Sequence, residues 1–149
     1  MLDRFTREDI PEARRIENLP GYDAYVGQWE QAAHEAELMS PDARYLAWRE
    51  GGRLTGFVMF QQFREPRVLL RRIVVEAPGM GSGRALLRAA VDWAFANSPA
   101  RAVWLQVKHG NDRAMHVYEQ EGFVIDGKDE ATLKMSVSRD GWAARKDSK

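Results

Sequence analysis

The sequence of 149 residues contains no cysteine, which excludes disulfides, a thiolate nucleophile and thiolate metal ligands. It has no excess of charge, because 22 Lys and Arg residues balance 22 Asp and Glu residues. There is thus no overall basic field to attract nucleic acid or an anionic membrane. No apolar run approaches the roughly 18 to 20 residues that a membrane-spanning helix needs.

What is present is an ordinary globular composition, 44% hydrophobic and 30% charged. The N-terminus is charged from Asp3 onward and lacks the apolar centre of a signal peptide. We therefore expect a cytoplasmic protein that binds neither nucleic acid, nor membrane, nor metal. We also expect one domain over residues 1–138 and a charged tail over residues 139–149, loose except at Trp142.

Hydrophobic periodicity and turn residues divide the chain into alternating groups of strands and helices. The expected strands are residues 1–5, 44–49, 54–63, 68–75, 102–107, 123–125 and 131–137. The expected helices begin after Thr6, span 29–39, follow the glycines near residue 81, and run from Asn111 to Gly122. Because a helix separates strands 68–75 and 102–107, these two should be parallel and the rest of the sheet antiparallel.

Three alternate glycines, Gly79, Gly81 and Gly83, separate the strand at 68–75 from an amphipathic helix. Glycine allows a tight turn and a close approach of ligand to backbone. The first N–H groups of a helix lack internal partners and, with the helix dipole, form an anion site. Such a turn suits a pyrophosphate, and Arg84 can add a charge-assisted contact. A simple tight loop is the alternative interpretation.

Two other phosphate-binding turns fit this segment poorly. A Rossmann fingerprint places G-x-G-x-x-G after the first strand of a β-α-β unit, with an acidic residue about 20 positions later. Here the glycines are spaced G-x-G-x-G, and about seventy residues of helix and strand precede them. A Walker A loop ends in Gly-Lys-Ser/Thr, whereas this loop continues as Gly83-Arg84-Ala85.

Two segments, taken together, resemble the GNAT superfamily of N-acetyltransferases. Residues 70–75 (LRRIVV) and 81–87 (GSGRALL) are similar to the family's strand L-x-x-I-x-V and its pyrophosphate loop. Residues 111–123 (NDRAMHVYEQEGF) are similar to its Asn followed by A-x-x-x-Y-E-x-x-G-F. The resemblance covers residues 43–137 well and the N-terminal helices loosely.

The resemblance implies an α/β fold of three layers, a mixed but mostly antiparallel sheet of about six or seven strands with helices on both faces. It implies acetyl-CoA as cosubstrate and direct acetyl transfer to a primary amine of a small molecule or peptide. Homodimers are common in the family. CoA would be bound by Ile73, Val74, Val75, Gly79, Met80, Gly81, Ser82, Gly83, Arg84, Asn111, Arg113, Ala114 and Tyr118.

One loop position departs from the family pattern, which has Gln or Arg three residues before the first loop glycine. Depending on which pair of glycines is aligned, Pro78 or Glu76 stands at this position. Because the loop acts mainly through backbone N–H groups, we expect CoA binding to survive the change.

The resemblance makes Tyr118 the candidate general acid for the departing CoA thiolate, since a phenol is protonated at neutral pH. Helical spacing alone would make Tyr118 a core aromatic instead. Asn111 is either a helix N-cap or a cofactor ligand, and the two roles are compatible. The strand at 68–75 carries no carboxylate, so the general base is sought among Glu17, Glu30, His34 and Glu37 in the N-terminal helical region. Of these, His34 and Glu37 are the candidates, and His34 has the more suitable unperturbed pKa.

The acceptor amine is the least defined part of the hypothesis. Trp29 is the candidate substrate residue, as an aromatic face for a cationic amine. Glu30, Glu35 and Glu37 would suit a cationic acceptor. Two other classes of function stay open: a GNAT-fold module that binds acetyl-CoA without turnover, and a dinucleotide-binding domain.

Overall fold

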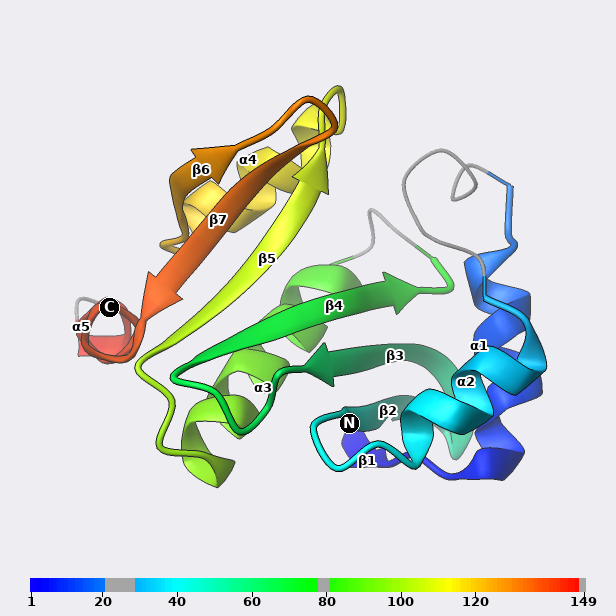
Figure 1. The fold of residues 1–149 in the computed structure, drawn as a ribbon. Helices are drawn as coiled ribbons and strands as arrows, with labels where there is room; N and C mark the ends of the chain where they lie inside the picture. The colour runs from blue at the N-terminus through cyan, green and yellow to red at the C-terminus, as the bar shows by residue number, and fades with distance from the viewer. Residues whose placement is uncertain (21–28, 78–80, 148–149) are drawn as a thin grey trace.

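The computed structural model describes residues 1–20, 29–77 and 81–147 (Figure 1). The N-terminal elements are β1 (Leu2–Arg4), the 3-10 turn η1 (Arg7–Asp9), α1 (Ile10–Glu17) and α2 (Gln31–Leu38). The central elements are β2 (Arg44–Glu50), β3 (Arg53–Gln61), β4 (Arg67–Val75), α3 (Ser82–Asn97) and β5 (Ala102–Lys108). The chain ends with α4 (Asp112–Gln120), β6 (Val124–Lys128), β7 (Thr132–Ser138) and α5 (Arg139–Asp147).

The strands form one seven-stranded sheet in the order β1-β2-β3-β4-β5-β7-β6. β4 and β5 are parallel, and the other neighbouring strands are antiparallel. The crossover from β4 through α3 to β5 makes their pairing parallel, as expected from the sequence. The expected α/β fold with a mixed, mostly antiparallel sheet is confirmed. In the described ranges no helix is long and apolar enough to cross a membrane.

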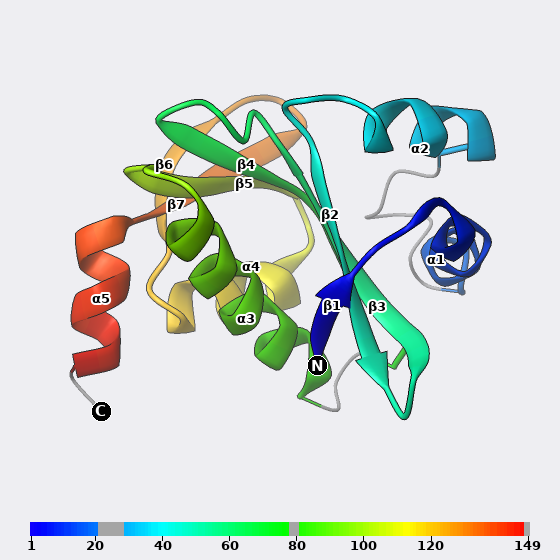
Figure 2. The ribbon, with the colours of Figure 1, turned by 90° about the horizontal axis from the view of Figure 1, so that it is seen from below.

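Helices cover both faces of the sheet, with α1 and α2 on one face and α3 and α4 on the other (Figure 2). Because side chains alternate along a strand, β3 supplies both cores. Phe57 and Met59 pack with α1, whereas Val58 and Phe60 pack with α3. Each face therefore has its own hydrophobic core, and the three-layer arrangement follows.

Two glycines and one cap fix the turns around the central strands. Gly51 and Gly52 have φ angles of +61° and +79° between β2 and β3, as a two-residue hairpin turn requires. Thr6 and Asp9 form a capping box before α1, which confirms Thr6 as an N-cap.

The C-terminal residues do not form a loose tail. They form α5, in which Trp142 is 3% exposed and donates its Nε1–H to Asp92 Oδ1 at 2.8 Å. The Arg139 guanidinium donates to three carbonyl oxygens at 2.7–3.0 Å. One belongs to Phe95 in the last turn of α3, and the others belong to Ser98 and Ala100, which follow this helix. The expectation of a loose segment was wrong because these tertiary contacts hold a stretch whose composition is mostly charged. The exception made for Trp142 is confirmed.

Candidate functional site

The strands β4 and β5 diverge after a short stretch of pairing. Their ladder joins residues 67–69 to residues 102–104, and beyond it the two strands separate (Figure 1). A cavity of about 1230 Å³ lies there, lined by β4, β5, α4 and the start of α3. It exceeds the usual range for small-molecule sites, about 300 to 1,000 Å³. The cavity therefore has room for a long, extended ligand.

The main chain of β4 faces this gap at alternate residues. Glu76 donates its N–H to Thr55 O at 2.7 Å, which fixes the hydrogen-bonding phase of β4 on β3. Bonded and non-bonded pairs alternate in an antiparallel ladder, so Val74 also directs its amide and carbonyl to β3. The main-chain groups of Ile73 and Val75 point to the opposite side, toward β5. All three residues line the cavity.

The glycine-rich turn leads directly into α3. Gly81 is the N-cap residue with φ +86°, and its carbonyl accepts from Ala85 N–H at 3.1 Å. Gly81 and Gly83 both line the cavity, and Ser82 is the first residue of the helix. The positive φ explains why glycine is needed at position 81. Pro78, Gly79 and Met80 lie outside the described residues.

We expect Gly81→Ala to weaken acetyl-CoA binding about tenfold. A Cβ at φ +86° has open space around it, so the substitution acts through backbone strain of about 1 kcal/mol and through displaced N–H groups. Gly52→Ala is the matched control, since Gly52 also has a positive φ and open space, but lies in the distant β2–β3 hairpin. Isothermal titration should show weaker binding for the first variant alone. Equal affinities would contradict the role of the turn.

Arg84 lies at the cavity wall but is engaged with α4. Its Nη1 donates to Glu121 Oε2 at 2.8 Å and its Nη2 to Gln120 Oε1 at 2.6 Å. The Glu121 side chain, 2% exposed, also accepts from Arg88 at 2.7 and 2.9 Å and from Arg145. These bonds tie the start of α3 to the end of α4. Contact of Arg84 with a phosphate stays a prediction.

Glu76, one of the two residues that replace the family's usual Gln or Arg, is bound by arginines from two elements. Its carboxylate accepts from Arg53 of β3 and from Arg15 of α1. Hydrogen bonds from Arg53 and then Arg15 lower the pKa of this carboxyl to about 2. Glu76 therefore stays ionised and anchors the end of β4.

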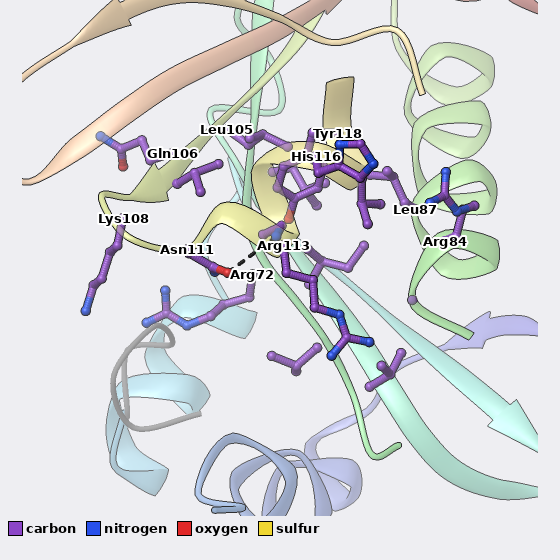
Figure 3. A pocket seen from close by; sticks show the side chains of 18 of the residues that line it. Arg72, Arg84, Leu87, Leu105, Gln106, Lys108, Asn111, Arg113, His116 and Tyr118 are labelled. Atoms are coloured by element: carbon purple, nitrogen blue, oxygen red, sulfur yellow. Dashed lines mark hydrogen bonds between the residues drawn. The ribbon is translucent and has the colours of Figure 1, made fainter. Parts of the chain in front are cut away.

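The first turn of α4 brings three predicted ligands to the cavity. Asn111 Oδ1 accepts from Ala114 N–H at 3.4 Å, which confirms Asn111 as an N-cap (Figure 3). The cap uses the side-chain oxygen only, so the amide nitrogen keeps its donors for a ligand. Ala114 and the exposed Arg113 also line the cavity.

Tyr118 lies on the same helix and lines the same cavity (Figure 3). It is half-buried, and its ring packs on Phe123 with the centroids 5.8 Å apart. Burial disfavours the phenolate and raises the pKa of Tyr118 to about 12. The residue thus belongs to the core and to the cavity wall, and at neutral pH it is a proton donor.

The two candidate bases both lie on α2. His34 is fully buried, with Nε2 2.7 Å from Glu17 Oε1 and Nδ1 2.7 Å from Tyr45 Oη. Glu37 accepts from Gln61 Nε2 at 3.2 Å. Neither is among the described residues that line the cavity. Their role as bases stays a prediction.

Trp29 contacts cations of the protein itself. The guanidinium carbons of Arg71 and Arg72 lie 5.9 and 5.3 Å from its ring centroid, and the His34 ring lies 5.4 Å away. A bound cationic amine would compete with both arginines for this ring. Contact of Trp29 with the substrate stays a prediction.

Arg72 and the lining residues of β5 are not among the site residues predicted from the sequence. Arg72 is 5% exposed and lines the cavity, as do residues 105–108 of β5. A signal was available for Arg72, because Arg71 and Arg72 are consecutive in a strand with both faces covered. Because consecutive side chains point to opposite faces of the sheet, at least one of these two arginines could be expected to be buried under a helix.

Comparison with known proteins agrees with this geometry. The sequence model of the acetyltransferase (GNAT) family matches residues 9–123. The chain is 31% identical to the N-alpha-acetyltransferase RimI of Mycobacterium tuberculosis over 99% of this chain and 92% of that protein. The spermidine N-acetyltransferase of Vibrio cholerae, solved with CoA and spermine, has a TM-score of 0.81 at 19% identity, covering 96% and 97% of the two chains. AAC(6')-Ib, solved with paromomycin and acetyl-CoA, has a TM-score of 0.80 at 18% identity, covering 96% and 95%.

The chain therefore belongs to the GNAT acetyltransferase family. It is an N-acetyltransferase, which moves the acetyl group of acetyl-CoA to an amine. The solved structures, at less than 20% identity, establish the shared fold and leave the acceptor open.

Proposed function

We propose that the protein acetylates a primary amine of a peptide or a small molecule, with acetyl-CoA bound in the gap between β4 and β5. The meeting of two separate sequence motifs at one cavity carries this proposal. Ile73, Gly81 and Gly83 come from the first motif, and Asn111 and Tyr118 come from the second. Two motifs that lie far apart in the sequence thus line the same cavity.

In the proposed reaction, the amine nitrogen attacks the thioester carbon and loses a proton to a base. The C–S bond breaks, and the sulfur takes up a proton. The main chain of β4 at Ile73 and Val75, which faces the gap, would align the pantetheine arm and stabilise charge on the carbonyl oxygen. The main chain of Val74, also expected to contact the cofactor, is directed to β3 instead. Tyr118 would donate to the sulfur as negative charge develops there.

The cofactor's phosphates would lie at the two helix starts. The backbone N–H groups predicted to hold the pyrophosphate at the start of α3 belong to Gly79, Met80, Gly81, Ser82 and Gly83. Arg84 and Arg113 would add charge-assisted contacts, and Asn111 and Ala114 would contact the ligand from α4.

The base and the acceptor are open parts of the proposal. Both ring nitrogens of His34 are engaged, so a proton would have to reach it through Glu17 or Tyr45. Glu37 remains the alternative. The name of the Mycobacterium tuberculosis relative supports an α-amine as acceptor, whereas the Vibrio cholerae neighbour is named for spermidine.

We also propose that the enzyme acts in the cytoplasm, which is in keeping with its cysteine-free sequence. The family allows a homodimer, and gel filtration combined with light scattering would establish the state in solution.

The test is a pair of measurements on the purified protein. Isothermal titration should show binding of acetyl-CoA and none of NAD. A thiol-release assay with a panel of peptide and small-molecule amines should show CoA release that depends on the amine. Binding without release for every amine would indicate a module without turnover and would contradict the proposal.

A further inference from the structure

Arg72 is a cation buried within the sheet. Its side chain is 4% exposed and extends from β4 toward the face covered by α1 and α2 (Figure 3). Desolvation lowers its pKa, although guanidinium remains charged at neutral pH. Replacing a buried ion pair by apolar residues is often neutral or stabilising. A structural role alone therefore does not explain why this position is an arginine.

A chain of buried polar groups holds Arg72 in place. Arg72 Nε donates to Glu17 Oε2 at 3.3 Å, and Glu17 Oε1 lies 2.7 Å from His34 Nε2. Tyr45 Oη lies 2.7 Å from His34 Nδ1, and burial raises the pKa of this phenol. A protonated Tyr45 can donate to Nδ1, and an N–H on Nε2 of His34 then faces Glu17 Oε1. Each donor in this series of groups, from Tyr45 through His34 and Glu17 to the Arg72 Nε–H, then faces an acceptor.

The guanidinium itself is not fully satisfied. Nη1 donates to the Arg71 carbonyl at 3.4 Å, whereas Nη2 is buried and has no hydrogen-bond partner. Within the described part of the chain it is the single buried side-chain nitrogen or oxygen in this condition. Buried polar groups without a partner are rare and call for an explanation. A ligand that supplies an oxygen would provide the missing acceptor.

Arg72 lines the end of the cavity that lies toward the N-terminal helices. We call this the acceptor end and define it by Leu19, Pro20, Arg71, Arg72 and Val74, all of which line the cavity. The CoA motifs on α3 and α4 approach from the other face of the sheet. A ligand that meets the thioester from the acceptor end would therefore pass Arg72.

The charges at this end do not suit a polycation. Arg71 and Arg72 line it. The nearby carboxylates are engaged elsewhere, with Glu30 bound by Arg14 and Glu35 bound by Arg7, both at 2.9 Å. Two of the three carboxylates of the acidic rim inferred from the sequence are thus paired with the protein's own arginines, and the third, Glu37, accepts from Gln61.

We propose that Arg72 selects acceptor amines in which the carbon that bears the amine also bears a carbonyl or carboxylate group, and that Nη2 donates to an oxygen of this group. This inference rests on the proposed N-acetyltransferase function of the same cavity. Tyr45, His34 and Glu17 act as positioning residues for the guanidinium. The shared chemistry of the acceptor is the oxygen, which a peptide amide or a free amino acid can supply.

The test compares acceptors that differ in this oxygen. Alaninamide, alanine and isopropylamine share the amine and the methyl group, and spermidine is the polycation. The ratio of kcat/KM for alaninamide to that for isopropylamine is measured in wild type, Arg72→Met and Arg72→Lys. Comparing ratios between variants cancels the intrinsic reactivity of each amine. Arg67→Met is the matched control, because Arg67 lies on the same strand, is exposed and pairs with Asp126 outside the cavity.

We expect the ratio to fall about 10- to 100-fold in Arg72→Met, and less in Arg72→Lys, which keeps the charge but loses the guanidinium fork. Alanine in place of alaninamide shows whether the carboxylate or the amide is preferred. Arg67→Met should keep the wild-type ratio, and the Kd of acetyl-CoA should stay within about twofold in all variants. If Arg72→Met does not fold, the Arg72→Lys ratio decides.

Three results would overturn the inference while leaving the proposed function intact. These are an unchanged ratio in the Arg72 variants, a loss of acetyl-CoA affinity in the same variants, or spermidine as the best acceptor of the wild type. If the wild type binds no acetyl-CoA and acetylates no amine, the proposed function fails, and the inference falls with it.

Discussion

Replacing Tyr118 by phenylalanine should lower kcat by about 100-fold and leave the Kd of acetyl-CoA within about twofold. The substitution removes one hydroxyl from the cavity wall and keeps the ring contact with Phe123. Because the hydroxyl is proposed to donate as the C–S bond breaks, its loss should affect the transition state more than the bound ground state. kcat and kcat/KM should therefore fall together. Steady-state thiol release and isothermal titration measure the two quantities.

A second donor on the same helix provides the comparison. His116 is exposed and also lines the cavity. If His116→Ala abolishes turnover while Tyr118→Phe does not, the assignment of the acid is wrong. Thermal melting of both variants checks that any loss is not a loss of fold.

The raised pKa of Tyr118 makes a further prediction about pH. An unperturbed phenol, with a pKa of about 10, would begin to lose its proton near pH 9. Burial raises the pKa of Tyr118 to about 12, so the residue stays protonated through pH 10. The kcat profile should show no decline from this group between pH 7 and 10. A decline that disappears in Tyr118→Phe would contradict the raised pKa.

Most of the fold could be predicted from local patterns. Alternating apolar residues gave the strands, and a helix between residues 75 and 102 required β4 and β5 to be parallel. The paired glycines at 51 and 52 predicted the hairpin turn. The cavity wall that carries the predicted cofactor residues could be predicted for a different reason, since these residues come from contiguous motifs at the starts of α3 and α4.

The acceptor side could not be predicted in the same way, because it depends on contacts between distant segments. Glu17, His34 and Tyr45 come from α1, α2 and β2, and no local pattern places them beside Arg72. Helix α5 was missed for the same reason, since Trp142 and Arg139 are fixed by α3 and the segment after it. The orientation of Arg84 depends on Glu121, 37 positions later.

Replacing Glu121 by glutamine should destabilise the protein by about 2 kcal/mol at pH 7, a fall in Tm of about 4 to 8 °C. The buried carboxylate accepts hydrogen bonds from Arg84, Arg88 and Arg145 and joins α3, α4 and α5. Removing a buried partner commonly costs 3 to 5 kcal/mol, but Arg84 and Arg88 are 33% and 42% exposed and can be rehydrated. Glu119→Gln is the matched control, because Glu119 is an exposed carboxylate on the same helix. Equal Tm values for the two variants would contradict the role of Glu121.

The dependence of this difference on pH has a defined sign. Hydrogen bonds from the three arginines, led by Arg88, lower the pKa of Glu121 from its ordinary 4.5 to about 2 in the folded protein. A carboxyl with a lowered pKa in the folded state adds stability above its unfolded pKa and loses it as the pH falls. The stability gap between wild type and Glu121→Gln should therefore be full at pH 7 and narrow from about pH 5 toward pH 2. Urea unfolding at several pH values measures the gap, and a gap that widens on acidification would refute the ion-pair account. Because the same carboxylate joins the two helices that flank the cofactor cavity, the acetyl-CoA affinity of Glu121→Gln should fall as well.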